Sequence, residues 1–224
     1  MSVAAVIFDL DGVLLESEQV WNAAKRELTL RYSGVWRPEA ERAMLGMSST
    51  EWSRYMHEEL ELPLDPPRIS REVAALVAER YRRELPLIPG ADEAVRAIAA
   101  RWPLGLASSS NREIIELVLE LAGWERLFSA ITSSEEVANG KPAPDVYVET
   151  AARLGADAGS CVAVEDSDAG IRSALAAGLS VVAIPNRAYP PAPETVERAH
   201  LQLASVAELD PEAIVRAAQR QTLG

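Results

Sequence analysis

The sequence is poor in the features of secreted, membrane and nucleic-acid-binding proteins. Its single cysteine, Cys161, has no partner for an intrachain disulfide. That thiol begins the apolar run 161–164, which favours a buried core side chain over a nucleophile. No apolar run approaches the length that crosses a bilayer, and the first residues, Met1-Ser2-Val3, lack the basic segment of a signal peptide. We therefore expect a cytoplasmic protein with no membrane partner.

Positive charge is also scarce. Lys and Arg together number 22 against 34 Asp and Glu, which gives a formal net charge of −12. Because binding to a phosphate backbone needs clustered cations, we expect no nucleic-acid partner. An enzyme of this charge with an anionic substrate would have to supply positive charge locally, from a metal, a lysine or helix N-termini.

What remains is the composition of an ordinary globular protein. The 224 residues are 48% hydrophobic and 25% charged, which is typical of a soluble chain. This length suits one large domain, or a core with a smaller appendage.

The order of the expected elements indicates the fold class. Residues 4–8 form an apolar run typical of a strand buried on both faces, and residues from about 17 to 84 contain no convincing strand and read as helices. From residue 89 onward, expected helices at 91–100, 112–121, 145–154 and 169–176 alternate with expected strands at 104–107, near 130–131, at 161–164 and at 181–184. The alternation predicts an α/β fold with a doubly wound parallel sheet.

The helical block reads as an insertion after the first strand. We accordingly expect an α/β core of residues 1–15 and 86–224 and a small inserted helical domain of residues 16–85. The strand at 181–184 closes the expected series, and the proline-rich segment 185–193 is expected to be a loop.

Two carboxylates follow the first strand directly. Asp9 and Asp11 stand two positions apart and precede Gly12. Ligands of open α/β sheets sit at the carboxyl ends of the strands, so both side chains would project into that crevice. An ordinary hydrophilic turn is the competing interpretation, because Asp-Gly is a common turn dipeptide.

A hydroxyl-rich segment and a lysine follow two later strands. Ser108-Ser109-Ser110-Asn111 opens a helix, where hydroxyls and backbone N–H groups could bind an anion. Helix capping is the more ordinary role for such residues. Lys141 lies in a Gly-Lys-Pro turn ahead of another helix, and a surface lysine is the ordinary alternative there.

Further acids follow the strand at 161–164. Glu165, Asp166 and Asp168 fall within four positions and would repel one another without a cation or solvent, although they could also simply begin a helix. Taken with the preceding signals, four strand ends contribute carboxylates, a hydroxyl, an ammonium and more carboxylates to one sheet edge. Oxygen ligands without His or Cys suit Mg²⁺, and these are the parts needed to move a phosphoryl group.

The four signals, in this order, resemble the motifs of the haloacid dehalogenase superfamily, in its phosphatase branch near β-phosphoglucomutase. The segment 9–14 is similar to the first motif, Ser108 to the second, Lys141 to the third and Glu165-Asp166 to the fourth. The resemblance implies a Rossmann-like core with residues 16–85 as a helical cap. It also implies a small phosphorylated metabolite as substrate, and we expect the enzyme to be a monomer.

The resemblance assigns a role to each motif. It makes Asp9 the nucleophile that forms an aspartyl-phosphate, and Asp11 the acid and base. It makes Mg²⁺ the cofactor, held by Asp9, Asp166 and the backbone carbonyl of Asp11, with Glu165 assisting directly or through water. Ser108 and Lys141 would bind the phosphoryl group, and we place two further candidates for substrate binding, Ser109 and Asn111, beside them.

Three functions are compatible with these motifs: hydrolysis, mutase chemistry and non-catalytic binding. Asp11 disfavours dehalogenation, because the dehalogenases lack that second aspartate. The mutase carries a cap histidine and a cap arginine at the positions that align with Trp21 and Ser49 of this chain. We therefore expect a phosphatase and keep a sugar phosphate mutase as the alternative. A non-catalytic binding module is the third hypothesis, since a fold alone does not imply activity.

Substrate identity would be decided by the cap. Trp21, Met47, Trp52 and Arg54 are candidates for substrate contact. Aromatic residues of helical caps more often pack than recognise a ligand.

Overall fold

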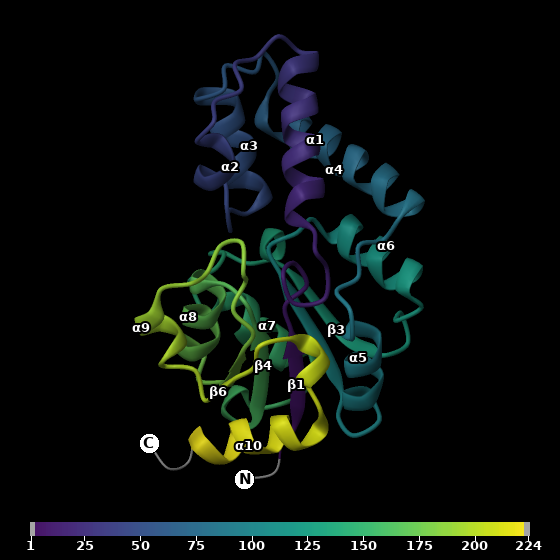
Figure 1. Cartoon of the computed structure of the whole chain (residues 1–224), viewed down its shortest axis with the longest axis vertical. Coiled ribbons are helices and arrows are strands. Elements are labelled where there is room, and N and C mark those ends of the chain that lie inside the picture. Colours follow the sequence, from purple (N-terminus) through teal and green to yellow (C-terminus); the bar gives the residue numbers. More distant parts are fainter. Residues whose placement is uncertain (1–2, 222–224) are drawn as a thin grey trace.

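A computed structural model describes residues 3–221 of the chain (Figure 1). Its centre is one parallel sheet of six strands in the order β3-β2-β1-β4-β5-β6. These strands are β1 (Ala5–Phe8), β2 (Leu104–Ser108), β3 (Phe128–Ser133), β4 (Cys161–Glu165), β5 (Ser180–Ala183) and β6 (Leu201–Gln202). The predicted doubly wound α/β fold is confirmed.

The first strand lies in the middle of the sheet. Phe8, its last residue, is in register with Leu106 of β2 on one side and Val164 of β4 on the other. The chain runs outward from β1 through β2 to β3 and then returns to β4, so the strand order reverses beside β1. Ligand crevices of open α/β sheets form at such a reversal.

Helices cover both faces of the sheet, as its apolar strands require. Val6 and Phe8 contribute to a cluster with α5 (Ala91–Ala99), α6 (Arg112–Ala122) and α10 (Pro211–Gln221). Ala5 and Ile7 point to the other face and pack with α7 (Asp145–Arg153) and α8 (Asp168–Ala176). Side chains of one strand alternate between faces.

Three helical turns and a short helix complete the core. They are η1 (Ser134–Glu136), η2 (Ala158–Ser160), η3 (Val206–Glu208) and α9 (Pro193–Val196). The loop prediction for 185–193 agrees with the structure up to the first residue of α9. The last strand, β6, was not expected; its two residues are too few to show an alternating pattern.

The helical block stands over the carboxyl ends of the strands (Figure 1). It consists of α1 (Glu18–Arg31), α2 (Ala40–Ala43), α3 (Ser49–Glu58) and α4 (Pro66–Arg83), with no strand in these residues. The two chain segments that connect it to the core pair with each other: Glu16 N–H donates to Pro86 O at 2.8 Å, and Ile88 N–H donates to Leu14 O at 3.0 Å. The division into a core of 1–15 and 86–224 and a cap of 16–85 stays a prediction.

Within residues 3–221, no helix combines the length and the apolar composition needed to cross a membrane.

Candidate active site

Three buried carboxylates gather at the ends of β1 and β4. Asp9 follows β1, Glu165 ends β4 and Asp166 comes next; each offers one oxygen within 4.8 Å of the others. Asp9 and Asp166 are 6% and 4% exposed. Burial raises the pKa of Asp9 to about 7, with the charges of Glu165 and Asp11 adding to it and Lys141 opposing. Burial and the neighbouring acids raise the pKa of Asp166 as well.

Lys141 is the cation of this group. Its Nζ lies 2.7 Å from Asp9 Oδ1 and 2.5 Å from Glu165 Oε1, and its side chain is 4% exposed. Burial lowers the pKa of Lys141, but the two carboxylates outweigh that effect and raise it above its ordinary value. The ordinary alternative, a surface lysine, is therefore wrong: the turn before α7 delivers the ammonium to the nucleophile candidate.

Glu165 is the most enclosed acid of the site. Its Oε1 accepts from Lys141 and, at 2.9 Å, from the hydroxyl of Tyr147, while its Oε2 accepts from the N–H groups of Asp166 and Ser167. A Cβ at Gly170 in the first turn of α8 would lie 1.8 Å from Glu165 Oε1, so only glycine leaves room there. Both oxygens are thus occupied by protein donors.

Asp11 faces the hydroxyl segment after β2. Its Oδ2 accepts from Ser110 Oγ at 2.7 Å and from Ser108 Oγ at 3.4 Å. Its Oδ1 is buried and accepts no hydrogen bond from the residues that the structure describes. Ser108 Oγ in turn accepts from Ser110 N–H at 3.0 Å. The segment 108–110 therefore satisfies one of its own backbone N–H groups and also holds Asp11.

Ser109 and Asn111, the other two residues predicted to bind substrate, lie in different places. Ser109 lines a cavity of about 150 Å³ together with Asp9, Asp11 and Lys141. Asn111 does not line it: its Nδ2 donates to Ser70 Oγ at 3.1 Å and to Glu135 Oε1 at 2.8 Å. Asn111 therefore joins the core to α4 of the helical block.

The helical block closes the same cavity from the other side. Trp21 of α1 and Trp52 of α3 line it and meet edge to face, with ring centroids 6.0 Å apart. Met47 lines it as well, whereas Arg54 is exposed and does not. Trp21 and Trp52 therefore pack against each other and also line the cavity.

A cation that the sequence analysis missed lies beside these two rings. Lys25 of α1 is 6% exposed and lines the cavity. Its Nζ is 5.1 Å from the ring centroid of Trp52 and 5.9 Å from that of Trp21. Burial lowers the pKa of Lys25 to about 8, with Asp11 acting in the opposite direction. The available signal was its position four residues after Trp21, on the apolar side of α1.

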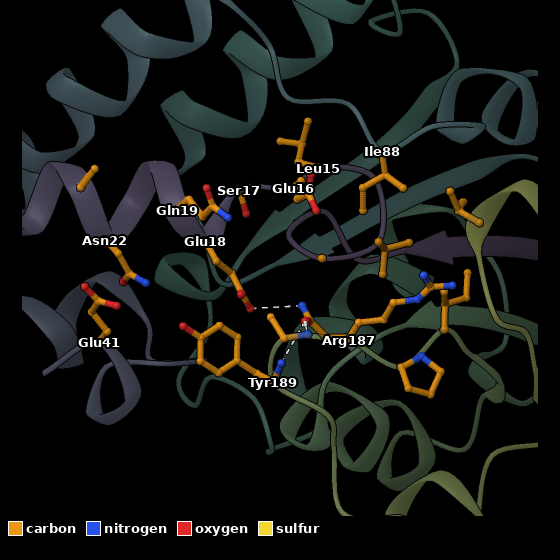
Figure 2. A pocket seen from close by; sticks show the side chains of 18 of the residues that line it. Leu15, Glu16, Ser17, Glu18, Gln19, Asn22, Glu41, Ile88, Arg187 and Tyr189 are labelled. Atoms are coloured by element: carbon orange, nitrogen blue, oxygen red, sulfur yellow. Dashed lines mark hydrogen bonds between the residues drawn. The ribbon is translucent and has the colours of Figure 1, made fainter. Parts of the chain in front are cut away.

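The loop after β5 ties the acids to the helical block. Asn186 Nδ2 donates to Asp166 Oδ2 at 3.0 Å and to Glu18 Oε1 at 3.1 Å. Burial, with the charge of Asp11, raises the pKa of Glu18 to about 7, and Asn186 opposes that shift. Figure 2 shows Glu18 at the start of α1 reaching this loop, and both line a neighbouring cavity of about 850 Å³. Asn186 therefore links a candidate metal ligand to the first residue of α1.

Comparison with known proteins identifies the family. A model of the haloacid dehalogenase-like hydrolases matches residues 3–178. The chain belongs to this family.

Two relatives and one crystal structure illustrate its place among the haloacid dehalogenase-like hydrolases. The chain is 32% identical over 219 residues to a probable pseudouridine-5'-phosphatase of Drosophila melanogaster, which covers 94% of the chain and 93% of the relative. It is also 32% identical over 185 residues to a bifunctional riboflavin kinase/FMN phosphatase of Arabidopsis thaliana; these are 82% of the chain but only 48% of that relative, about half its length. A CbbY variant of Rhodobacter sphaeroides in complex with xylulose-1,5-bisphosphate superposes with a TM-score of 0.84 at 26% identity, over 95% of the chain and 99% of that structure.

In this hydrolase, Gly12 lets the turn after β1 approach Asp166. Gly12 has a φ of +84°, and a Cβ there would lie 1.9 Å from Asp166 Oδ2. We expect Gly12→Ala to displace the Asp166 carboxylate and to lower kcat/KM by about a hundredfold or more, because misplacing a group of the site by about 1 Å has that effect. Steady-state hydrolysis of a phosphomonoester measures it.

Gly178 provides a matched control for that substitution. Its φ is +85°, and a Cβ there would meet no atom within 4 Å. Gly178→Ala should therefore lose about 1 kcal/mol of stability through backbone strain and keep its kcat/KM. Equal activity losses in the two variants would show that strain, and not the contact with Asp166, makes Gly12 necessary.

Proposed function

We propose that the protein is a Mg²⁺-dependent phosphatase that hydrolyses a small phosphomonoester through an aspartyl-phosphate on Asp9. The observation that carries the proposal is the buried cluster of Asp9, Glu165 and Asp166 with Lys141 as its cation. Its family membership and the phosphatase names of its relatives support the reaction class.

The residues of the site fit a magnesium ion. Three carboxylates share one ammonium, so a buried negative charge remains that a divalent cation would neutralise. The donors are all oxygen, as hard cations prefer. Asp9, Asp166 and the backbone carbonyl of Asp11 would hold the ion. When bound, it would screen the charge of the incoming phosphoryl group and of Asp9.

Glu165 has a different part in this proposal from the metal contact expected from the sequence. Lys141, Tyr147 and two backbone N–H groups already occupy its oxygens. A direct bond to the ion would replace one of those donors. We therefore assign Glu165 to positioning Lys141, with any contact to the metal running through water.

Asp9 is the proposed nucleophile. An oxygen of its carboxylate attacks phosphorus and the ester oxygen leaves, which splits one difficult displacement into two easier ones. Lys141 opposes the effect of burial on the pKa of Asp9 and so favours its ionised form. It would also neutralise the equatorial phosphoryl oxygens, and Ser108 and Ser109 offer hydroxyl and N–H donors beside them. Phosphate is then released when water attacks the acyl-phosphate.

Asp11 is the proposed acid and base. Its Oδ1 has no donor among the described residues, so this oxygen is free to carry a proton to the leaving ester oxygen. The same oxygen then accepts the proton of the water that attacks the acyl-phosphate. Ser110 holds the other oxygen at 2.7 Å and orients the carboxyl group for both steps.

Mutase chemistry is the alternative that the cap must decide. Ser49, at the position aligned with the mutase arginine, donates a hydrogen bond to Glu135 of the core, and Trp21 stands in place of the histidine. Both mutase anchors are therefore missing. Lys25 offers one cation nearby, so products must be measured: with β-glucose 1-phosphate and a trace of bisphosphate primer, a phosphatase releases phosphate, whereas a mutase yields glucose 6-phosphate.

The metal requirement tests the proposed function. We expect activity with Mg²⁺, loss of activity with a chelator and inhibition by Ca²⁺, because the larger ion accepts more ligands and draws Asp9 away from in-line geometry. Phosphate release from p-nitrophenyl phosphate measures all three conditions. Full activity in chelator, or equal rates with the two ions, would contradict the proposal.

A further inference from the structure

Lysine is rare in this chain, and the few lysines lie at one site. The sequence contains two lysines against twenty arginines. Both lysines, Lys25 and Lys141, are buried and line the same cavity of about 150 Å³. Lys141 enters it from the core and Lys25 from α1 of the helical block.

The two ammonium groups differ in their partners. Lys141 is held by Asp9 and Glu165. For Lys25, the structure gives no hydrogen bond and no ion pair among residues 3–221; its Nζ lies over the faces of Trp21 and Trp52, and Asp11 is the nearby charge that acts on it. The ammonium borders the cavity without a hydrogen-bond acceptor from the described residues.

Two tryptophan faces do not satisfy a buried ammonium. Cation–π contacts attract the charge but accept no conventional hydrogen bond. Taking an ammonium out of water costs several times more free energy than such contacts return. Apolar packing of α1 would be served better by a leucine or methionine at position 25. No described residue accepts a hydrogen bond from Lys25, and the cavity beside it can admit an anion that does.

The position of Lys25 indicates which part of a substrate would supply the anion. Asp9, Lys141 and Asp166 occupy the core side of the cavity, where the reacting phosphoryl group must sit. Lys25 lies on the opposite side, with Trp21 and Trp52. It therefore faces the portion of the substrate that the reaction leaves unchanged.

We infer that Lys25 binds a second anionic group of the substrate, a phosphate or a carboxylate, so that the preferred substrates are phosphomonoesters with two negative ends. A neutral hydroxyl would leave the charge of Lys25 uncompensated, whereas an oxyanion supplies both charge and acceptors. This inference rests on the proposed function for the identity of the reacting end.

Lysine-specific NMR tests binding without requiring turnover. With ¹³C at the lysine ε-carbons, the Asp9→Asn variant should give two side-chain signals, assigned by adding Lys25→Met. Fructose 1,6-bisphosphate and 3-phosphoglycerate should shift the Lys25 signal strongly. Their matched single-anion partners, fructose 6-phosphate and glycerol 3-phosphate, should leave it nearly in place. The two pairs separately test phosphate and carboxylate as the second anion.

Kinetics provides the second readout. Lys25→Met keeps an unbranched side chain beside the tryptophan rings and removes the charge. We expect it to lower kcat/KM for the two-anion substrates by about tenfold to a hundredfold, the loss of one charged hydrogen bond, and for their single-anion partners by much less. Lys25→Arg should restore part of the preference. Arg26→Met, at the exposed next residue, should leave the preference unchanged.

The outcomes separate the two proposals. Equal losses on both substrate classes, or a Lys25 signal indifferent to the second anion, would overturn the inference and leave a packing role for Lys25. A Lys25 signal that responds to two-anion ligands in a protein that hydrolyses no phosphomonoester would uphold the anion site and refute the proposed phosphatase.

Discussion

Replacing Asp9 by asparagine is expected to abolish turnover, by about 10⁴-fold or more in kcat. The amide has nearly the volume of the carboxylate but cannot attack phosphorus to form a stable acyl-phosphate. Lys141 keeps its contact with Glu165 in this variant, so the fold should persist. Phosphate release and circular dichroism, measured on the same preparation, check both statements.

The matched control is the same chemical change at an exposed aspartate. Asp157 precedes η2, and its side chain is exposed. Asp157→Asn should keep wild-type kcat and KM. Asp9→Asn that retains more than trace activity, with contaminating phosphatase excluded, would remove Asp9 from the role of nucleophile.

Replacing Lys141 by methionine is expected to cause the largest loss of stability. It leaves Asp9 and Glu165, whose side chains are 8% and 0% exposed, without their cation. Breaking a buried pair by removing one partner costs about 3–5 kcal/mol. Urea unfolding in chelator should show this as a lower midpoint with an unchanged slope, and activity should fall as well.

Lys25→Met is the matched control for that result, with the opposite sign. Burial lowers the pKa of Lys25 to about 8 in the fold, against about 10.4 in an unfolded chain. Below pH 8, Lys25 is protonated in both the folded and the unfolded state, so the folded state bears the full free-energy cost of burying the ammonium. Between these two pKa values the folded state releases its proton first, so wild-type stability rises with pH. Lys25→Met should therefore exceed wild type in stability at pH 7, and the difference should shrink toward pH 10.

The outcome for the lysine pair discriminates cleanly. Destabilisation by both substitutions would mean that Lys25 has an acid partner or an essential packing role. If neither substitution changes the free energy of unfolding, the contacts of Lys141 with Asp9 and Glu165 contribute less than about 3–5 kcal/mol to stability.

The sequence predicted the sheet well because its strands are buried on both faces and helices separate them. The runs at 104–107 and 161–164 are short, apolar and followed by polar residues, so their ends are sharp. Asp9 and Lys141 could be placed for the same reason, since strand ends of a parallel sheet meet at one edge. Local pattern and global topology agree at these positions.

What sequence reasoning missed depends on packing between distant segments. Lys25 looks like a solvated helix residue until α1 and α3 bring Trp21 and Trp52 around it. Asn111 has the right position for substrate binding, but its amide is taken by Ser70 of α4 and by Glu135. The spacing of Trp21 and Lys25 is visible within α1, but the contacts of Lys25 with Trp52 and of Asn111 with Ser70 and Glu135 leave no signal within one element.

Glu165 shows a further limit. Its neighbour Asp166 and its place after β4 favoured a metal ligand. Only the folded chain brings Tyr147 and Lys141 to its oxygens, 18 and 24 residues away in sequence. The residue type of Glu165 indicated a polar role at the site, but the sequence could not predict how many hydrogen-bond donors surround its carboxylate.

Trapping the covalent intermediate shows whether Asp9 forms an aspartyl-phosphate during turnover. The protein should be mixed with a ³²P-labelled phosphomonoester and Mg²⁺, quenched in acid during turnover and digested at low pH, where acyl-phosphates survive. We expect label on the peptide that contains Asp9, and this label should be lost on treatment with hydroxylamine and absent from Asp9→Asn. Steady release of phosphate with no labelled peptide, or label on a peptide that lacks Asp9, would contradict this expectation.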